Sequence, residues 1–344
     1  MKNNQLMIYG AYGYAGELMV REAVAQGLRP IIAGRDDEKL KPIATELSLE
    51  CRAFGVRNTG SNLQDISVLL NCAGPFSATA EPLARACLAQ QIHYLDITGE
   101  IDIFRKCHAL DEEARQQNVL ILPGAGTDIV PTDCLAAMLK EKLPVATRID
   151  LALSFGTNPS IGTVNTMIES FGKGGLIREG GMLKVVSNAF QMRKIPFQNK
   201  PQWAMTIPWG DVFTSGISTG VPDGAVYMAM PRMSIYMIRL TNPVKGILNT
   251  QFGQKITKRL AGWLMKKGPD AKALEAGRGQ FWGEAEAPDG EKLEMTMSTP
   301  NVYALTATVG IRIAQYCLDY TGPGGYYTPS MLLGSRFIES IPGI

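Results

Sequence analysis

Histidine is scarce in this sequence of 344 residues: only His93 and His108 occur, and neither has a motif partner. A zinc site is therefore not expected. No two cysteines form a C-x-x-C pair, so we expect reduced core thiols of a cytoplasmic protein rather than a disulfide framework. The cysteines are Cys51, Cys72, Cys87, Cys107, Cys134 and Cys317. No apolar run approaches the ~20 residues of a membrane span. The amino-terminal residues 1–5 lead directly into an apolar strand, with no signal-peptide pattern.

The most informative stretch is residues 6–24. An apolar run, Leu6–Tyr9, ends in three glycines spaced three apart, and a helical pattern begins at Glu17. This order predicts strand, tight turn and helix. We expect the glycines to adopt positive φ and to let backbone N–H groups approach a pyrophosphate at the helix N-terminus. The predicted cofactor-binding residues here are Gly10, Tyr12, Gly13, Tyr14 and Gly16. The alternative interpretation is a glycine turn that serves packing alone.

The end of the next predicted strand indicates which dinucleotide binds. That strand is predicted over residues 29–33, and Gly34 and Arg35 follow it. A carboxylate near this position would bind the ribose 2′-OH, whereas a guanidinium suits a 2′-phosphate. Arg35 therefore favours NADP(H) over NAD(H). Asp36 and Asp37 argue against this, although they also fit the N-cap and first turn of the next helix. A solvated Arg35 without a ligand is the alternative.

The first 140 residues alternate apolar strands with amphipathic helices. This rhythm predicts an α/β fold with a Rossmann-like doubly wound parallel sheet. The predicted strands are 51–56, 68–72, 93–97 and 119–122, and the helices are 37–48, 63–66, 79–90 and 102–117.

Longer β-like stretches from about Arg148 predict a second α+β domain with a mixed sheet. They are 149–155, 203–207, 226–230 and a hairpin of 281–287 with 292–298. We predict a dinucleotide-binding domain over 1–147, a substrate domain over 148–301, and a final segment, 302–344, that packs back on the first domain.

Polar residues and glycines follow the ends of several predicted strands. Ligands bind beyond the carboxyl ends of such strands, so we expect Ala73, Gly74, Pro75 and Phe76 to contact the nicotinamide side of the cofactor. The candidate catalytic residues, each a possible proton donor, are Tyr94, Glu100 and Asp128. The alternatives are a structural turn at 73–76 and a helix-capping role for Asp128.

Residues 224–269 contain no Asp or Glu but eight basic residues. Within them, 243–267 reads as a basic amphipathic helix with a tryptophan, which suits peripheral contact with an anionic membrane surface. The alternative is an ordinary helix packed on the sheet.

Five motifs in order make the chain resemble the saccharopine dehydrogenase-like oxidoreductases, in the branch with the trans-acting enoyl reductases. They are Gly10-Ala-Tyr-Gly-Tyr-Ala-Gly16, Ala33-Gly34-Arg35, Cys72-Ala-Gly-Pro-Phe76, Tyr94-x-Asp96-x-x-Gly99-Glu100 and Gly126-Thr-Asp128-x-Val-Pro-Thr-Asp133. The second half contributes Phe281-Trp-Gly-Glu284 and Tyr303-x-Leu-Thr-Ala307. The resemblance implies NADP, hydride transfer and a domain for substrate binding and dimerisation, hence a homodimer.

Two positions depart from the family pattern. Tyr12 stands where the family often has a small hydroxyl residue, which puts a side-chain contact to the pyrophosphate in doubt. Asp128-Ile129-Val130-Pro131 replaces the Asp-Pro-Gly of true saccharopine reductases, which argues against lysine-pathway chemistry.

We therefore expect an NADP(H)-dependent reductase of a hydrophobic enoyl, acyl or lipid-like substrate, without nucleic-acid binding. A non-catalytic NADP-binding regulatory module and a saccharopine-type amino-acid dehydrogenase are the alternatives.

Overall fold

The computed structural model describes residues 4–155, 174–240, 242–244 and 277–344, which belong to two compact units. Unit 1 consists of Met1–Val130 and Tyr303–Gly334, and unit 2 of Pro131–Val302 and Ser335–Ile344. Compared with the predicted boundaries, helix α6 (Val130–Lys142) lies in unit 2 from Pro131 onward, and so does the chain end, Ser335–Ile344.

Local packing explains why α6 belongs to unit 2. A Cβ added to Gly283 would lie 2.6 Å from Leu139 Cδ1, and Leu135 and Leu151 are also close. The leucines of α6 therefore pack directly on the unit 2 sheet at a position where glycine leaves room for them.

Unit 1 contains a parallel sheet in which the strands over 6–9, 31–34 and 68–71 are buried on both faces, as expected for a sheet covered by helices, while the edge strand over 51–53 is half-buried or exposed. The strand order is β15-β6-β5-β4-β1-β2-β3. This confirms the predicted Rossmann-like doubly wound fold. Its strands are β1 (Leu6–Tyr9), β2 (Ile31–Gly34), β3 (Cys51–Ala53), β4 (Val68–Asn71), β5 (His93–Asp96), β6 (Leu120–Leu122) and β15 (Gly325–Tyr326).

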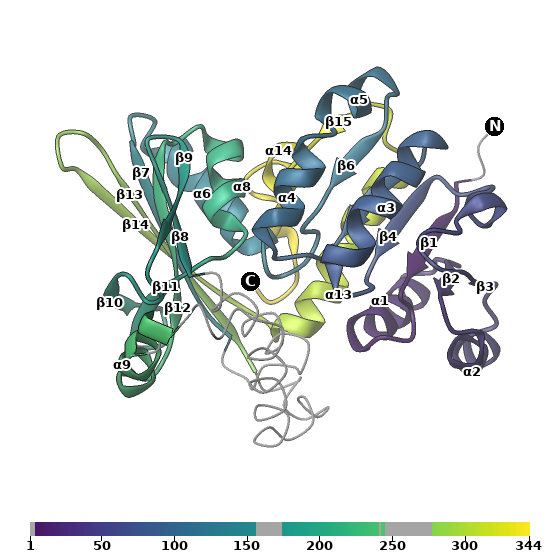
Figure 1. The fold of residues 1–344 in the computed structure, drawn as a ribbon, viewed down its shortest axis with the longest axis horizontal. Helices are drawn as coiled ribbons and strands as arrows, with labels where there is room; N and C mark the ends of the chain where they lie inside the picture. Colours follow the sequence, from purple (N-terminus) through teal and green to yellow (C-terminus); the bar gives the residue numbers. More distant parts are fainter. Residues whose placement is uncertain (1–3, 156–173, 241, 245–276) are drawn as a thin grey trace. The chain divides into compact units, whose positions relative to one another are not determined.

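The strand order decides on which face of the sheet each helix of unit 1 lies. The chain crosses from β3 to β4, so the order reverses beside β1, and right-handed crossovers put α1 and α2 on one face and α3 and α4 on the other (Figure 1). The predicted helix 102–117 is two helices, separated at Ala109 and Leu110. The helices are α1 (Tyr14–Ala25), α2 (Asp37–Leu47), η1 (Gly60–Leu63), α3 (Phe76–Ala89), α4 (Ile101–His108), α5 (Asp111–Gln116), α13 (Val302–Leu318) and α14 (Pro329–Leu333).

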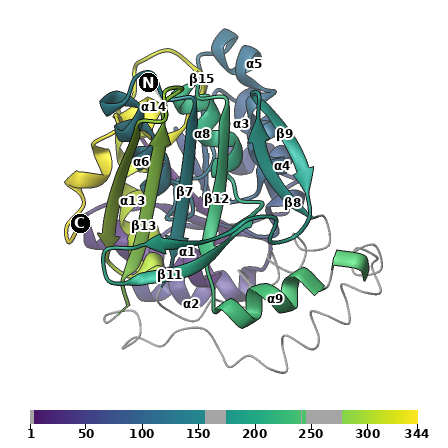
Figure 2. The same cartoon turned by 90° about the vertical axis from the view of Figure 1, so that its left-hand side faces the viewer.

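Unit 2 is built on a mixed sheet of order β10-β11-β12-β7-β13-β14, with β8 pairing to β12 and β9 to β8 (Figure 2). The predicted β13–β14 hairpin is present, and every residue of 279–286 pairs with a residue of 292–299. Its strands are β7 (Arg148–Ser154), β8 (Gly175–Glu179), β9 (Met182–Val186), β10 (Met192–Pro196), β11 (Pro201–Ile207), β12 (Asp223–Ala229), β13 (Gly279–Glu286) and β14 (Lys292–Thr299). The helices are α6, α8 (Asp211–Thr219), α9 (Arg232–Leu240), η2 (Asn242–Val244) and η3 (Phe337–Ser340).

The core of unit 2 centres on Trp282 and Tyr227. Arg193 stacks on Trp282, with its Cζ 4.6 Å from the ring centroid, and its guanidinium binds the buried Glu284 at 3.0 Å. The buried charge of Glu284 is thus paired, as burial requires. Among the helices that the structure describes, none is long and apolar enough to cross a membrane.

Candidate functional site

The turn after β1 ties the ends of the first two strands together. The N–H groups of Gly10 and Ala11 both donate to the carbonyl of Ala33, at 2.7 and 3.2 Å. Gly10 has φ +87°, whereas Gly13 has φ −76° and ψ 157°. Our expectation that the glycines of this turn share positive φ was therefore wrong for Gly13 and Gly16: only Gly10 makes the left-handed bend.

A side chain at each of the three glycines of this turn would meet different neighbours. A Cβ on Gly10 would lie 2.7 Å from the backbone N of Ala73, so β1 and the loop after β4 are in direct contact. A Cβ on Gly16 would lie 2.1 Å from the carbonyl oxygen of Gly10, so Gly16 brings α1 close to the strand. A Cβ on Gly13 would meet only the Gly10 oxygen, at 3.2 Å. Gly13 is therefore the position where backbone is left accessible to a ligand.

Two valine substitutions separate these roles. We expect Gly13→Val to fold, because its φ suits a β-branched residue, and to lose NADPH binding by at least about 100-fold, since the side chain blocks the pyrophosphate. Gly16→Val should instead unfold unit 1, because its side chain overlaps Gly10. Fluorescence titration with NADPH, together with thermal unfolding, checks both. Normal NADPH affinity in a folded Gly13→Val variant would mean that the turn only serves packing.

The N-terminus of α1 suits an anion. None of the described side chains caps it, and Gly13 is its N-cap residue. The first backbone N–H groups of a helix lack intrahelical partners and carry the positive end of its dipole. Tyr14, 44% exposed, begins the helix, and its ring meets that of Tyr303 edge-on with the centroids 5.2 Å apart. The first turn of α1 can thus receive a pyrophosphate beside an aromatic pair.

The carboxyl end of β2 presents an available cation. Arg35 is exposed and its guanidinium forms no hydrogen bond or ion pair with the residues that the structure describes. The neighbouring carboxylates are already paired: Asp36 binds Lys39 at 3.1 Å and Asp37 binds Lys41 at 2.8 Å. Because lysines neutralise both carboxylates, their repulsion of a 2′-phosphate is reduced, and Arg35 remains available to bind it.

Tyr12 lies over the end of β2. A Cβ on Gly34 would lie 2.6 Å from Tyr12 Cε1, so Gly34 is needed for the ring to pack there. Lys39 Nζ lies 5.6 Å from the centroid of the same ring. The Tyr12 ring therefore lies beside the end of β2, and its contact with a dinucleotide stays a prediction.

The loop after β4 carries the residues predicted to border the nicotinamide. Ala73 touches Gly10, Gly74 and Pro75 are exposed and joined by a cis peptide bond, and Phe76 is the first residue of α3. The helix thus begins earlier than the predicted residue 79. These positions lie at the carboxyl end of β4, beside the reversal in strand order, as the cofactor hypothesis requires.

A buried hydrogen-bond network links the ends of β4, β5 and β6. Asn71 Nδ2 donates to the hydroxyl of Tyr94 at 3.2 Å, and that hydroxyl donates to Asp96 Oδ2 at 2.8 Å. Asp96 Oδ1 accepts the N–H groups of Thr98 and Gly124, at 3.0 and 3.1 Å. Burial raises the pKa of Asp96 to about 6, although these hydrogen bonds lower it. The network fixes three strand ends relative to one another.

Tyr94, predicted as catalytic, has 0% exposure in this network. Burial and the adjacent Asp96 raise the pKa of its phenol. In this structure the hydroxyl does not reach the surface, so the geometry favours a positioning role, and proton donation by Tyr94 stays a prediction.

Tyr94→Phe distinguishes the two roles. Loss of its two hydrogen bonds should lower the free energy of unfolding by about 1–3 kcal/mol, because Asn71 and Asp96 each lose a partner in a buried site. Turnover at saturating NADPH should fall less than about tenfold. A fall of 100-fold or more in a folded variant would instead support proton donation, for which such losses are typical.

Asp128 lies in the turn after β6 and is half-buried. Its Oδ2 packs on Gly99, where a Cβ would lie 3.1 Å away. Desolvation raises the pKa of Asp128 to about 7. Glu100, half-buried, is the N-cap residue of α4, and its N–H donates to Thr98 Oγ1 at 3.1 Å. Asp128 is thus placed at the strand ends with a carboxyl that can hold or release a proton near neutral pH.

Sequence reasoning missed Asn71 and Thr306 as residues that support this site. Thr306 of α13 contacts Thr127, which precedes Asp128. The pairing of Asn71 with Asp96 across β4 and β5 was predictable in principle from aligned strand ends, whereas the Thr127–Thr306 contact spans 179 residues. In the parts of the chain described, no group of His, Cys, Asp and Glu could hold a metal ion.

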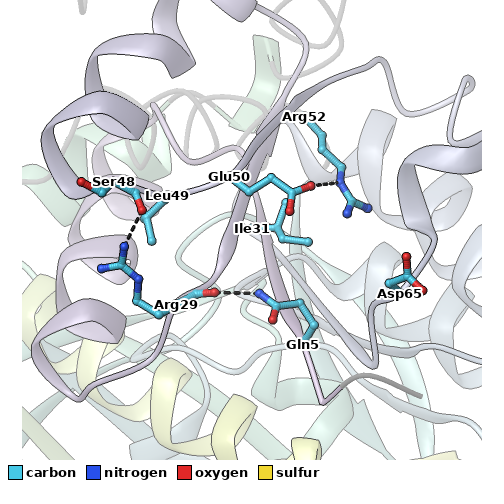
Figure 3. A pocket seen from close by; sticks show the side chains of 8 residues that line it. All are labelled: Gln5, Arg29, Ile31, Ser48, Leu49, Glu50, Arg52 and Asp65. Atoms are coloured by element: carbon cyan, nitrogen blue, oxygen red, sulfur yellow. Dashed lines mark hydrogen bonds and ion pairs between the residues drawn. The ribbon is translucent and has the colours of Figure 1, made fainter. Parts of the chain in front are cut away.

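A cavity of about 370 Å³ lies at the opposite edge of the sheet, before the amino ends of β1 and β2 (Figure 3). Its polar groups bind one another: Gln5 Nε2 donates to the carbonyl of Arg29 at 2.7 Å, and Arg52 binds Glu50 at 2.7 Å. Ligands of doubly wound sheets bind at the other edge. This cavity is therefore separate from the candidate cofactor site.

Comparison with known proteins agrees with these features. Residues 6–122 match the family model of the saccharopine dehydrogenase NADP binding domain. A rat saccharopine dehydrogenase-like oxidoreductase is 25% identical over 231 residues, 59% of this chain and 53% of its own length. A putative trans-acting enoyl reductase of Mycobacterium tuberculosis is 28% identical over 205 residues, 54% of this chain and 44% of its own. This chain thus matches about half the length of these relatives.

Among solved structures, the apo saccharopine dehydrogenase (L-Glu forming) of Saccharomyces cerevisiae has the same fold. The alignment has a TM-score of 0.63 and 10% sequence identity, and it covers 94% of both chains.

Proposed function

We propose that this chain, whose residues 6–122 match the family model of the saccharopine dehydrogenase NADP binding domain, is an NADP(H)-dependent reductase that transfers hydride to a hydrophobic enoyl- or acyl-type substrate. The observation that carries the proposal is Asp128: a carboxyl with a pKa of about 7 at the strand ends where the cofactor binds.

Four features of unit 1 support the binding of NADP. The uncapped N-terminus of α1 receives the pyrophosphate, and the unpaired Arg35 receives the 2′-phosphate. Gly13 keeps the backbone accessible, and residues 73–76 border the nicotinamide side. When bound, NADPH supplies the hydride.

Asp128 supplies the proton that completes the reduction. Addition of hydride to one carbon of a polarised double bond leaves negative charge on the substrate, and a proton must then be added to neutralise it. With a pKa of about 7, a substantial fraction of Asp128 is protonated at neutral pH, and the resulting carboxylate is reprotonated from solvent. Glu100 is the second candidate donor on the same edge, while Tyr94 and Asp96 hold the strand ends.

A hydrophobic substrate is supported by two observations. The Mycobacterium tuberculosis relative is named as an enoyl reductase, and this chain lacks the Asp-Pro-Gly of true saccharopine reductases. We further propose a homodimer, from the family resemblance, and a cytoplasmic location, which the unpaired thiols support. The basic helix predicted over 243–267, with its membrane contact, lies outside the described residues except at 243 and 244.

The proposal is tested by NADPH oxidation with a panel of enones and enoyl thioesters, against a panel of amino-acid and keto-acid pairs. We expect oxidation with members of the first panel only. Tight NADPH binding without turnover on either panel would favour the regulatory module, and turnover on the second would favour an amino-acid dehydrogenase.

A further inference from the structure

Helix α13 holds the turn that carries Asp128. The backbone N–H of Thr127 donates to Thr306 Oγ1 at 3.2 Å, and the Thr306 hydroxyl donates to Thr127 Oγ1 at 3.0 Å. Thr127 is 1% exposed. Both contacts are made at the residue directly before Asp128, by a helix 179 residues further along the chain.

The same turn is closely packed on both sides. A Cβ on Gly126 would lie 3.3 Å from Thr306 Cγ2 and 3.4 Å from Ile97 Cβ. The carbonyl of Gly126 accepts the N–H groups of Ile129 and Val130, at 3.1 and 2.9 Å. The backbone on either side of Asp128 is thus fixed, and any loosening at Thr306 is passed to the carboxyl that rests on Gly99.

We propose that Thr306 is a positioning residue for the proton donor Asp128, an inference that rests on the function proposed above. The Thr306 hydroxyl forms two hydrogen bonds with Thr127, so α13 sets where the carboxyl lies relative to the carboxyl ends of β5 and β6. The position of the Asp128 carboxyl therefore depends on α13, a helix near the end of the chain.

Loosening the turn should change the protonation of Asp128. Desolvation is what raises the pKa of Asp128 in the described part of the protein. The titratable groups on the adjoining elements include Asp96 at the end of β5, Glu100 after it, Asp133 on α6, and Tyr303 and Arg312 on α13. If the turn loosens and water reaches the carboxyl, its pKa falls toward that of an ordinary aspartate.

The ratio of NADP⁺ to NADPH dissociation constants, measured against pH, tests this without a substrate. An ionised carboxylate near the nicotinamide favours the positively charged ring of NADP⁺, so the ratio should change as Asp128 titrates. The variants are Thr306→Val, which removes the hydroxyl, and Thr306→Ser, which keeps it. Thr308→Val is the matched control on the same helix, and Asp128→Asn identifies the titrating group.

We expect an inflection near pH 7 in the wild type that Asp128→Asn abolishes. Thr306→Val should move it down by about one pH unit, while Thr306→Ser and Thr308→Val keep the wild-type midpoint. If Thr306→Val does not fold, Thr127→Val, which removes the other hydroxyl, should give the same downward shift.

The two proposals fail differently. A wild type without an inflection dependent on Asp128 overturns both the proton-donor role and the role of Thr306. An inflection that depends on Asp128 but keeps its midpoint in Thr306→Val, or in Thr127→Val where the former is unfolded, overturns only the role of Thr306.

Discussion

Asp128→Asn is expected to slow NADPH-dependent reduction by about 100-fold to 10,000-fold, the range found when a general acid is removed. Affinity for NADPH should change less than about twofold, because the proposed site places Asp128 at the reacting end of the cofactor and away from its phosphates. Steady-state rates and fluorescence titration measure the two effects. The matched control is Asp65→Asn, at the opposite edge of the sheet, which should leave both unchanged.

The stability of Asp128→Asn relative to the wild type should increase as the pH rises. Burial raises the folded-state pKa of Asp128 to about 7, above the 3.8 of an ordinary aspartate, so its stabilising contribution is complete below pH 3.8 and is lost as the pH rises through 7. Asparagine does not ionise, so the unfolding free energy of Asp128→Asn relative to that of the wild type should rise by about 4 kcal/mol between pH 4 and pH 8. A stability difference that does not vary with pH would contradict the raised pKa. A variant with undiminished turnover would contradict the proton-donor role.

Arg35→Ala should weaken NADPH binding by about tenfold to 100-fold and leave NADH binding unchanged. A hydrogen bond to a charged group contributes about 1.5–3 kcal/mol, and the 2′-phosphate that receives it is absent from NADH. Parallel titrations with both cofactors check this, with Arg29→Ala, an exposed arginine at the other edge of the sheet, as the control. Equal affinities for NADPH and NADH in the wild type would remove the argument for Arg35.

Much of unit 1 was predictable because its signals are local. The apolar strands, the glycine spacing and the position of Arg35 can be read within short windows of sequence. The backbone φ of Gly13 could not be predicted in this way, because the sequence does not show which of the three glycines makes the left-handed bend. The buried position of Tyr94 was partly predictable: Tyr94 and Asp96 are two residues apart in one strand and so share a face.

The remaining features depend on contacts that sequence alone does not reveal. The pKa of Asp128 follows from its burial against Gly99, and its support comes from Thr306, far away in the chain. The β8–β9 hairpin was not predicted, because every residue of β9 is exposed or half-buried and its pattern does not alternate clearly. The membership of α6 in unit 2 depends on glycine at position 283, on a strand far from α6 in sequence.

The most direct test of the central claim is transfer of deuterium from C4-deuterated NADPH to an enone or enoyl thioester. Mass spectrometry of the product should show one deuterium at the carbon that accepts hydride, from one of the two C4-deuterated NADPH diastereomers only. Asp128→Asn should form this product far more slowly. Saturable NADPH binding without deuterium in any product of the panel would contradict the account and identify the chain as a binding module.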